Sequence, residues 1–356
     1  MGTLSFNRIP LLAQSTYSRL VDSLVASATG DVTTGVTLVT KRIRGRTYWY
    51  AQGTVDGEKR QTYLGPESPE LDARIAAWRS AKTEEKTRAE LVAMARAGGA
   101  HTVTGAEARV FEQLASVFRI GAVLVGSHAF GVIGNSLGVR WSEVSVRTND
   151  IDLAHDPRIT VAVLKDSPLS RNDDLVPRFD ILNPTAPATS FQVRGTDIQV
   201  DLLTPMVGRD RSGPIVIPAL NAAATPLRFL DFLIEESQPG AVVGGKGVLV
   251  NVPRPGRYAL HKLIVASRRH TGASGPSKAA KDRAQAAALL DVLLSDLQGE
   301  ITLAWEALLA RGQGWATAAR ISIAQLDPTL VERLRYIGVI ADAKFARRAK
   351  PRGKSR

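Results

Sequence analysis

The sequence has no cysteine among its 356 residues, which excludes disulfide bonds and thiolate ligands for a metal. Its five histidines show no pairing such as His-x-x-x-His, so a zinc site is not expected. No apolar run reaches the roughly 18 residues of a membrane span. The first residues show no basic segment followed by an apolar run and a cleavage site. These absences predict a cytoplasmic protein without a membrane partner.

Acidic residues are in the minority. The chain has 34 Asp and Glu against 46 Lys and Arg, a formal net charge of +12 and a pI of about 10.1. Such a balance favours polyanionic partners, and a nucleotide or RNA would fit. Part of the excess lies in residues 344–356, which we interpret either as a solubilising tail or as a segment that attracts nucleic acid loosely.

A short apolar run ends in a Gly-Ser pair. Residues Ala122–Val125 are apolar and are followed by Gly126 and Ser127. This pattern predicts a buried strand that turns into a helix.

Two aspartates follow about twenty residues later. Asp150 and Asp152 flank Ile151, and on a strand the period of two places both carboxylates on one face and the isoleucine on the other. Two carboxylates on one face repel each other and need a cation or a proton between them. Mg²⁺, which prefers oxygen ligands, is the natural choice of cation. The alternative is that the pair lies in a solvated loop.

A third aspartate has a strand context of its own. Between Thr196 and Leu203, apolar residues alternate with polar ones, so Asp201 is predicted on the polar face of a strand. An ordinary exposed strand face is the alternative.

Taken in order, these features resemble the nucleotidyltransferase fold of the DNA polymerase β superfamily. The resemblance implies an α+β fold with a small mixed sheet flanked by helices. It implies that Asp150, Asp152 and Asp201 are catalytic and hold Mg²⁺ or Mn²⁺. Gly126 and Ser127, at a helix amino terminus, would bind the β- and γ-phosphates of an NTP such as ATP through backbone N–H groups.

Two predicted helices near the carboxy terminus extend this resemblance. The first carries Lys262 and the pair Arg268-Arg269, and the second opens with Lys-x-x-Lys281-Asp282. The arrangement looks like a motif of the abortive-infection type nucleotidyltransferases, the toxin halves of certain bacterial toxin–antitoxin pairs. It implies that Lys262, Arg268 or Arg269, and Lys281 face the triphosphate, while Asp282 joins the site or orients a basic neighbour. A solvated helix face is the alternative for the two lysines.

The first hundred residues lie outside these motifs. Helices are predicted over Leu11–Ala28 and Pro69–Ala97, with an antiparallel meander over residues 36–65 between them. In the meander, basic side chains alternate with aromatic ones, which suits stacking on nucleic acid but also a small sheet with one packed face. We expect an accessory module (1–100), a nucleotidyltransferase core (101–253), a C-terminal helical domain (254–343) and a basic tail (344–356).

The predicted reaction moves an NMP from an NTP to a hydroxyl acceptor. RNA, in particular a tRNA end, is favoured by the charge and the meander, and a protein side-chain hydroxyl is the alternative. A toxin or defence role would add a cognate antitoxin as partner. The rival interpretation is a catalytically inactive nucleic-acid-binding protein.

Overall fold

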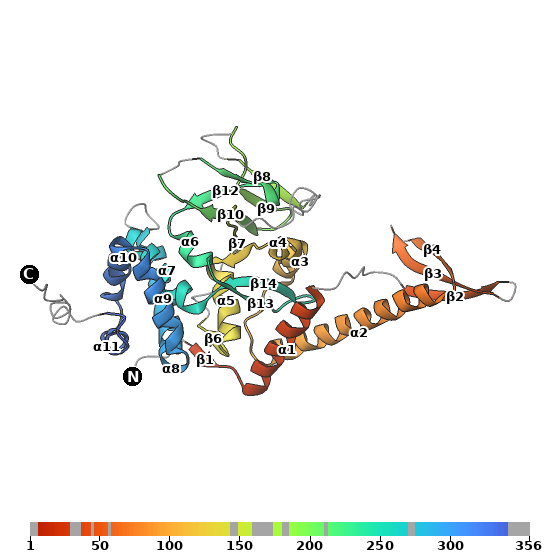
Figure 1. Ribbon diagram of the computed structural model, residues 1–356, viewed down its shortest axis with the longest axis horizontal. Helices are drawn as coiled ribbons and strands as arrows, with labels where there is room; N and C mark the ends of the chain where they lie inside the picture. Colours follow the sequence, from red (N-terminus) through yellow and green to blue (C-terminus); the bar gives the residue numbers. More distant parts are fainter. Residues whose placement is uncertain are drawn as a thin grey trace, which may run out of the picture.

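The protein is an α+β molecule in which several small sheets are flanked by helices, as predicted from the sequence. The computed structural model describes residues 6–28, 37–43, 46–55, 58–142, 149–158, 174–179, 185–209, 213–269 and 275–340. Figure 1 shows a main body from which the long helix α2 (Pro69–Ala97) projects as an arm with a small sheet at its end. The basic tail of residues 344–356 lies outside the described residues.

The largest sheet is mixed. Strand β7 (Asp150–Ala154) lies between β5 (Val123–Val125), to which it is antiparallel, and β10 (Gln199–Pro205), to which it is parallel. The sheet also contains β8 (Leu175–Arg178), β9 (Ser190–Val193), β11 (Ile215–Ile217) and β12 (Ala222–Leu227). Because the apolar residues of β7 and β10 alternate with polar ones, one face of each strand is fully buried while the other carries the aspartates.

Short helices connect to this sheet. Helix α5 (Gly126–Ser136) follows β5 without an intervening loop. Before β5, the chain forms α3 (Gly105–Gln113) and α4 (Ala115–Arg119), which are separated at Leu114. Further elements of the body are β1 (Phe6–Arg8), β6 (Val139–Trp141), η2 (Pro218–Leu220), α6 (Leu230–Ile234), and the hairpin of β13 (Ser237–Val242) and β14 (Val248–Pro253).

The carboxy-terminal helices share one hydrophobic core with the sheet. Helix α7 (Pro255–Arg268) contacts α8, α9 and α10, and its Tyr258, Leu260 and Leu263 are completely buried. The helices after α7 are α8 (Gly275–Asp296), α9 (Gln298–Ala310), α10 (Gln313–Ile323) and α11 (Pro328–Tyr336). This shared core fixes α7 and α8 beside the edge of the sheet where the aspartates lie.

The amino-terminal elements form as predicted. Helix α1 (Leu11–Ala28) packs on the carboxy-terminal half of α2 through a second core, which holds Leu20, Leu24, Leu91 and Val92. At the far end of α2, strands β2 (Thr37–Ile43), β3 (Arg46–Val55) and β4 (Glu58–Pro66) form the antiparallel meander. The indole N–H of Trp49 donates to Asp72 at 3.1 Å and joins the meander to α2. The boundaries of the four predicted domains stay a prediction.

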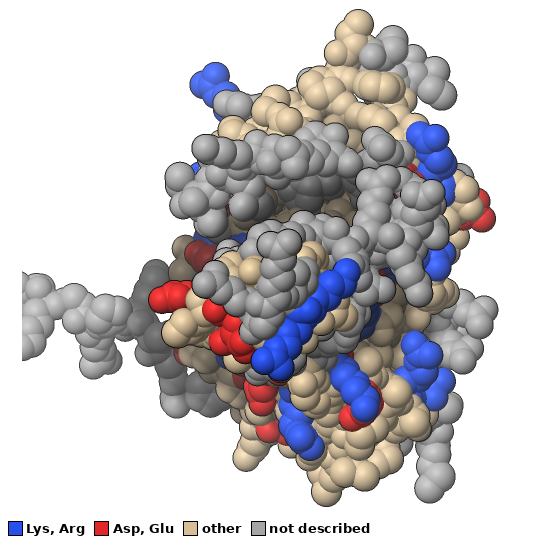
Figure 2. Space-filling model, turned by 90° about the vertical axis from the view of Figure 1, so that its right-hand side faces the viewer, with Lys and Arg blue, Asp and Glu red and all other residues tan. Residues whose placement is uncertain are grey.

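The described surface seen along the arm is mixed in charge. Figure 2 shows Lys and Arg side chains interspersed with Asp and Glu rather than gathered in one block. Among the described residues, no helix combines the length and the apolar character that crossing a bilayer requires.

Candidate active site

The pairing of β7 with β10 brings the three aspartates onto one face. The parallel register sets Asp201 opposite Asp152, and Gln199 opposite Asp150. Residues opposed in this way point to the same side, and residues two apart on one strand do so too. Adjacent strands are about 4.8 Å apart, so these carboxylates belong to one small region. The prediction that Asp150, Asp152 and Asp201 lie on strands is confirmed; their catalytic role stays a prediction.

Gly126 closes one side of this region. It begins α5 with φ +67°, a left-handed conformation that residues with a Cβ adopt at a cost. A Cβ at this position would overlap the carboxylate of Asp152, which therefore lies directly against the turn. Both the backbone conformation and the lack of space require glycine here.

The start of α5 is open to an anion. No described side chain caps it, and Ser127 lies buried in its first turn. The first N–H groups of a helix have no partner within the helix and sit at the positive end of its dipole. Such an end, beside carboxylates that can hold a cation, suits a phosphate group.

The carboxylates carry more negative charge than their surroundings balance. The pKa of Asp152 is raised to about 6, first because the group is buried and then because Asp201 and Asp150 repel its charge. Lys262 and Arg269 act in the opposite direction. A cation placed among the three aspartates would remove this repulsion.

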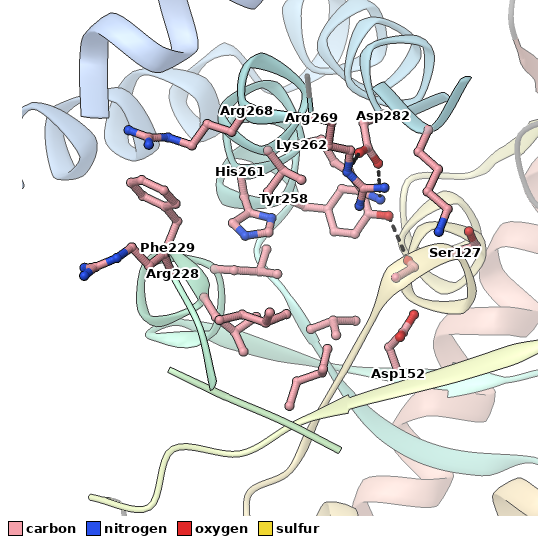
Figure 3. A pocket seen from close by; sticks show the side chains of 18 of the residues that line it. Ser127, Asp152, Arg228, Phe229, Tyr258, His261, Lys262, Arg268, Arg269 and Asp282 are labelled. Atoms are coloured by element: carbon pink, nitrogen blue, oxygen red, sulfur yellow. Dashed lines mark hydrogen bonds and ion pairs between the residues drawn. The ribbon is translucent and has the colours of Figure 1, made fainter. Parts of the chain in front are cut away.

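A buried aspartate on α8 organises the facing cations. Asp282 pairs with the ammonium group of Lys262 at 2.8 Å and with Nε of Arg269 at 3.0 Å (Figure 3). Of the two roles considered for Asp282, this contact favours the orientation of basic neighbours. The pKa of Lys281 is lowered by burial and by Lys262, while Asp282, Asp150 and Asp152 raise it. Lys281 therefore interacts electrostatically both with the charged residues of α7 and α8 and with the aspartates of β7.

One cavity of about 580 Å³ joins these groups, a volume typical of small-molecule sites. Every residue predicted for the site lines it: Gly126, Ser127, Asp150, Asp152, Asp201, Lys262, Arg268, Lys281 and Asp282. The structure thus gathers residues from the turn, two strands and two helices in one place. Arg147, the basic residue preceding the Asp-x-Asp pair, lies outside the described residues.

The two adjacent arginines have different surroundings. Arg269 pairs with Asp282, whereas the guanidinium of Arg268 lies over the ring of Phe229 at 4.6 Å. Figure 3 shows Arg268, Phe229 and Arg228 on the opposite side of the cavity from Asp152 and Ser127. Between Arg268 and Arg269, the geometry therefore favours Arg269 as the arginine that serves the carboxylate end.

Two residues of α7 that belong to the site were not identified in the sequence analysis. The completely buried Tyr258 donates its hydroxyl to the carbonyl of Gly126 at 2.8 Å, and burial raises its pKa well above the usual value, so it stays a phenol. His261 is neutral because burial, Lys262 and Arg269 lower its pKa to about 3. Helical spacing could have shown them, since Tyr258 lies one turn before Lys262 and His261 two turns before Arg268. Arg228, Phe229 and Lys278 also line the cavity.

The donor set fits a hard divalent cation. In the part of the chain that is described, no three His, Cys, Asp or Glu side chains stand in an arrangement that could hold a metal by themselves. The amide of Gln199 donates to Asp201 at 2.8 Å. Mg²⁺, however, is commonly held by one or two carboxylates together with water and substrate phosphates. Asp152, with its raised pKa and its neighbour Asp201, meets that requirement.

A comparison with known families agrees with this geometry. A family model described as Nucleotidyltransferase matches residues 102–310, more than half of the chain. The match spans the Gly126 turn, the aspartate strands, α7 and α8. No curated protein and no solved structure gave a match. The chain therefore belongs to this nucleotidyltransferase family and is an enzyme that acts on a nucleoside triphosphate.

Proposed function

We propose that the protein transfers an NMP from an NTP to a hydroxyl group with the help of Mg²⁺ or Mn²⁺. The observation that carries this proposal is the register of β7 and β10, which sets Asp152 opposite Asp201 beside the Gly126 turn. Opposite them, Lys262 and Arg269 are fixed by Asp282. A triphosphate needs this combination, because its charge exceeds what the metal alone neutralises.

Each group has a defined part in the reaction. The N–H groups at Gly126 and Ser127 bind the β- and γ-phosphates. Lys262, Arg269 and Lys281 balance the charge of the triphosphate. Asp150, Asp152 and Asp201 would hold the metal, which when bound polarises the triphosphate and lowers the pKa of the attacking hydroxyl.

The proton leaves as the new bond forms. Asp201 accepts the proton of the acceptor hydroxyl. At the same time, the oxygen of that hydroxyl attacks the α-phosphorus in line with the leaving group. The bond between the α-phosphorus and the bridging oxygen breaks, and pyrophosphate departs. Atoms and charges balance without any further reactant.

RNA, most directly a tRNA end, is the proposed acceptor. The net charge of +12 supports a polyanion. The meander supports it too, because Lys41 and Arg42 are exposed there and Lys41 lies over the ring of Tyr50 at 4.9 Å. The arrangement of Lys262, Lys281 and Asp282 supports a relationship to abortive-infection type enzymes, and with it a toxin or defence role with an antitoxin partner.

Labelled NTPs test the reaction. Each of the four is incubated with purified protein and total RNA, with Mg²⁺ or with EDTA. We expect label on RNA, its loss with EDTA, and its loss in Asp152→Ala. Asp197→Ala, which changes an exposed aspartate just before β10, is expected to keep activity. Label on protein would identify a side-chain acceptor. No label, with RNA binding intact on filters, would support the inactive nucleic-acid-binding alternative.

Expression in a bacterial host tests the toxin role. The wild-type chain is expected to arrest growth, and Asp152→Ala is expected to permit it at equal protein level. Equal growth of the two strains, with transfer active in vitro, would contradict a toxin role and leave the chemistry intact.

A further inference from the structure

The cavity has a second end with a different chemistry. The lining includes the apolar side chains of Leu230, Leu233 and Val265, and also Arg228, Phe229 and Arg268. Figure 3 shows the last three on the far side from Asp152. The acidic residues in the described lining are Asp150, Asp152, Asp201 and Asp282, which all belong to the phosphate end. The second end therefore offers apolar surface and hydrogen-bond donors.

Phe229 is held there in a strained conformation. Its φ of 68° and ψ of −1° lie in the left-handed region, which a bulky side chain rarely occupies. The rings of Phe229 and Trp315 pack nearly perpendicular to each other at a centroid distance of 4.5 Å, and the guanidinium of Arg268 lies over the Phe229 ring at 4.6 Å. Strain of this kind persists where the surrounding structure enforces it, and it concentrates at ligand sites. Here it keeps an aromatic ring at the border of the cavity.

Arg268 differs from the other cations of the cavity. Lys262 and Arg269 are engaged by Asp282, whereas Arg268 takes part in no ion pair within the described part of the chain. Figure 3 shows it on the other side of the cavity from Asp152, whose pKa Lys262 and Arg269 lower. Its guanidinium fork is thus available for a ligand that is not the triphosphate.

The direction of the bound nucleotide follows from the proposed function, on which this inference rests. With the β- and γ-phosphates at Gly126 and the α-phosphorus at the aspartates, the nucleoside has to extend away from the turn. The cavity continues in that direction to Phe229. We infer that Arg228, Phe229 and Arg268 form the subsite for the donor nucleobase, and that this base is guanine.

Guanine matches the donors present. An arginine fork binds two adjacent acceptors, and guanine offers O6 and N7 side by side. Adenine places an amino donor beside N7 and leaves one arm of the fork opposed to another donor. Stacking on an aromatic ring and on a guanidinium plane adds to the binding of a purine.

Binding of non-transferable nucleotides tests the inference. The affinities of α,β-methylene analogues of GTP, ATP, CTP and UTP, and of inorganic tripolyphosphate, are measured calorimetrically with Mg²⁺. The wild type is expected to bind the GTP analogue at least about tenfold more tightly than the ATP analogue, as one bidentate contact provides. Tripolyphosphate reports the phosphate end alone.

Two substitutions at position 268 separate base binding from phosphate binding. Arg268→Lys keeps the charge but loses the fork, and Arg268→Gln loses both. Both are expected to abolish the preference for guanine, raise KM for GTP with kcat retained, and leave tripolyphosphate affinity unchanged. Arg320→Gln is the matched control, because Arg320 also lies over an aromatic ring, that of Trp305, but is not among the residues that line the cavity.

The outcomes distinguish the inference from the function it deepens. Equal affinity for all four analogues, weaker tripolyphosphate binding in Arg268→Lys, or a change confined to KM for the acceptor would overturn the base subsite while leaving nucleotidyl transfer in place. Absence of any triphosphate binding and of any transfer by the wild type would overturn the proposed function itself.

Discussion

At the scale of single residues, the raised pKa of Asp152 links the stability of the fold to pH. Because its pKa is raised to about 6 in the folded protein, it stabilises the fold only when protonated. That contribution is complete below its ordinary pKa of 3.8 and is lost as pH rises through about 6. At pH 7.5 the ionised carboxylate of Asp152 therefore destabilises the folded protein.

Asp152→Asn is therefore expected to raise stability at pH 7.5 while it abolishes transfer. The gain should be about 1–3 kcal/mol, measured by thermal or urea unfolding in EDTA, and it should disappear at pH 4, where Asp152 is protonated. Asp197→Asn serves as the control for loss of a negative charge. A loss of stability in Asp152→Asn at pH 7.5, or a gain that is the same at both pH values, would contradict the assigned cause of the shift.

Gly126→Ala is expected to damage the site because it imposes strain and displaces the carboxylate of Asp152. We expect a loss of stability of about 1–3 kcal/mol and loss of transfer. Gly105→Ala is the matched control, since Gly105 also begins a helix but has open space around its Cα. Unfolding curves and initial rates of both variants check this. Activity retained by Gly126→Ala would show that the turn does not contact the phosphates.

At the scale of elements, a hydrogen bond from Tyr258 ties α7 to the Gly126 turn. Tyr258→Phe removes the bond to the carbonyl of Gly126 and leaves the packing of the ring against Phe130 in place. We expect a loss of about 0.5–1.5 kcal/mol in stability and a fall in kcat larger than the change in KM for the acceptor. Tyr336→Phe, at a tyrosine with 91% exposure, is the control. An unchanged kcat in Tyr258→Phe would show that the turn needs no support from α7.

The positions of several strands could be predicted from the sequence, but the way in which the strands pair could not. Alternation was enough to place Asp150, Asp152 and Asp201 on strands, but the register that sets Asp201 opposite Asp152 depends on tertiary contacts. Strand β13 was missed because it contains Pro239 and Gly240, which are unfavourable in strands and are accommodated here in a two-stranded hairpin.

The site shows the same limit. Consecutive residues on a helix point about 100° apart, so Arg268 and Arg269 could not be assigned to one end of the cavity or the other before the orientation of α7 was known. Phe229 gave no signal at all, because left-handed positions are usually marked by glycine or asparagine. What distinguishes these residues is the packing around them, which one sequence does not reveal.

At the scale of the whole molecule, the meander can be removed without touching the cores. None of the side chains that the structure describes within residues 37–66 belongs to the core around the sheet or to the core between α1 and α2. Replacing them with a short Gly-Ser linker should leave nucleotide binding unchanged and raise KM for RNA. Nucleotide affinity and rates of RNA labelling check this, with Lys41→Gln/Arg42→Gln as a milder variant. An unchanged KM for RNA would exclude the meander from acceptor binding.

The length of α2 has a consequence for the acceptor. A helix of 29 residues extends about 43 Å at 1.5 Å per residue, and the meander sits at its outer end (Figure 1). An acceptor that touched both the meander and the aspartates would have to bridge a distance of this order, as a folded RNA can and a mononucleotide cannot. The arm formed by α2 and the meander would then select acceptors by their size.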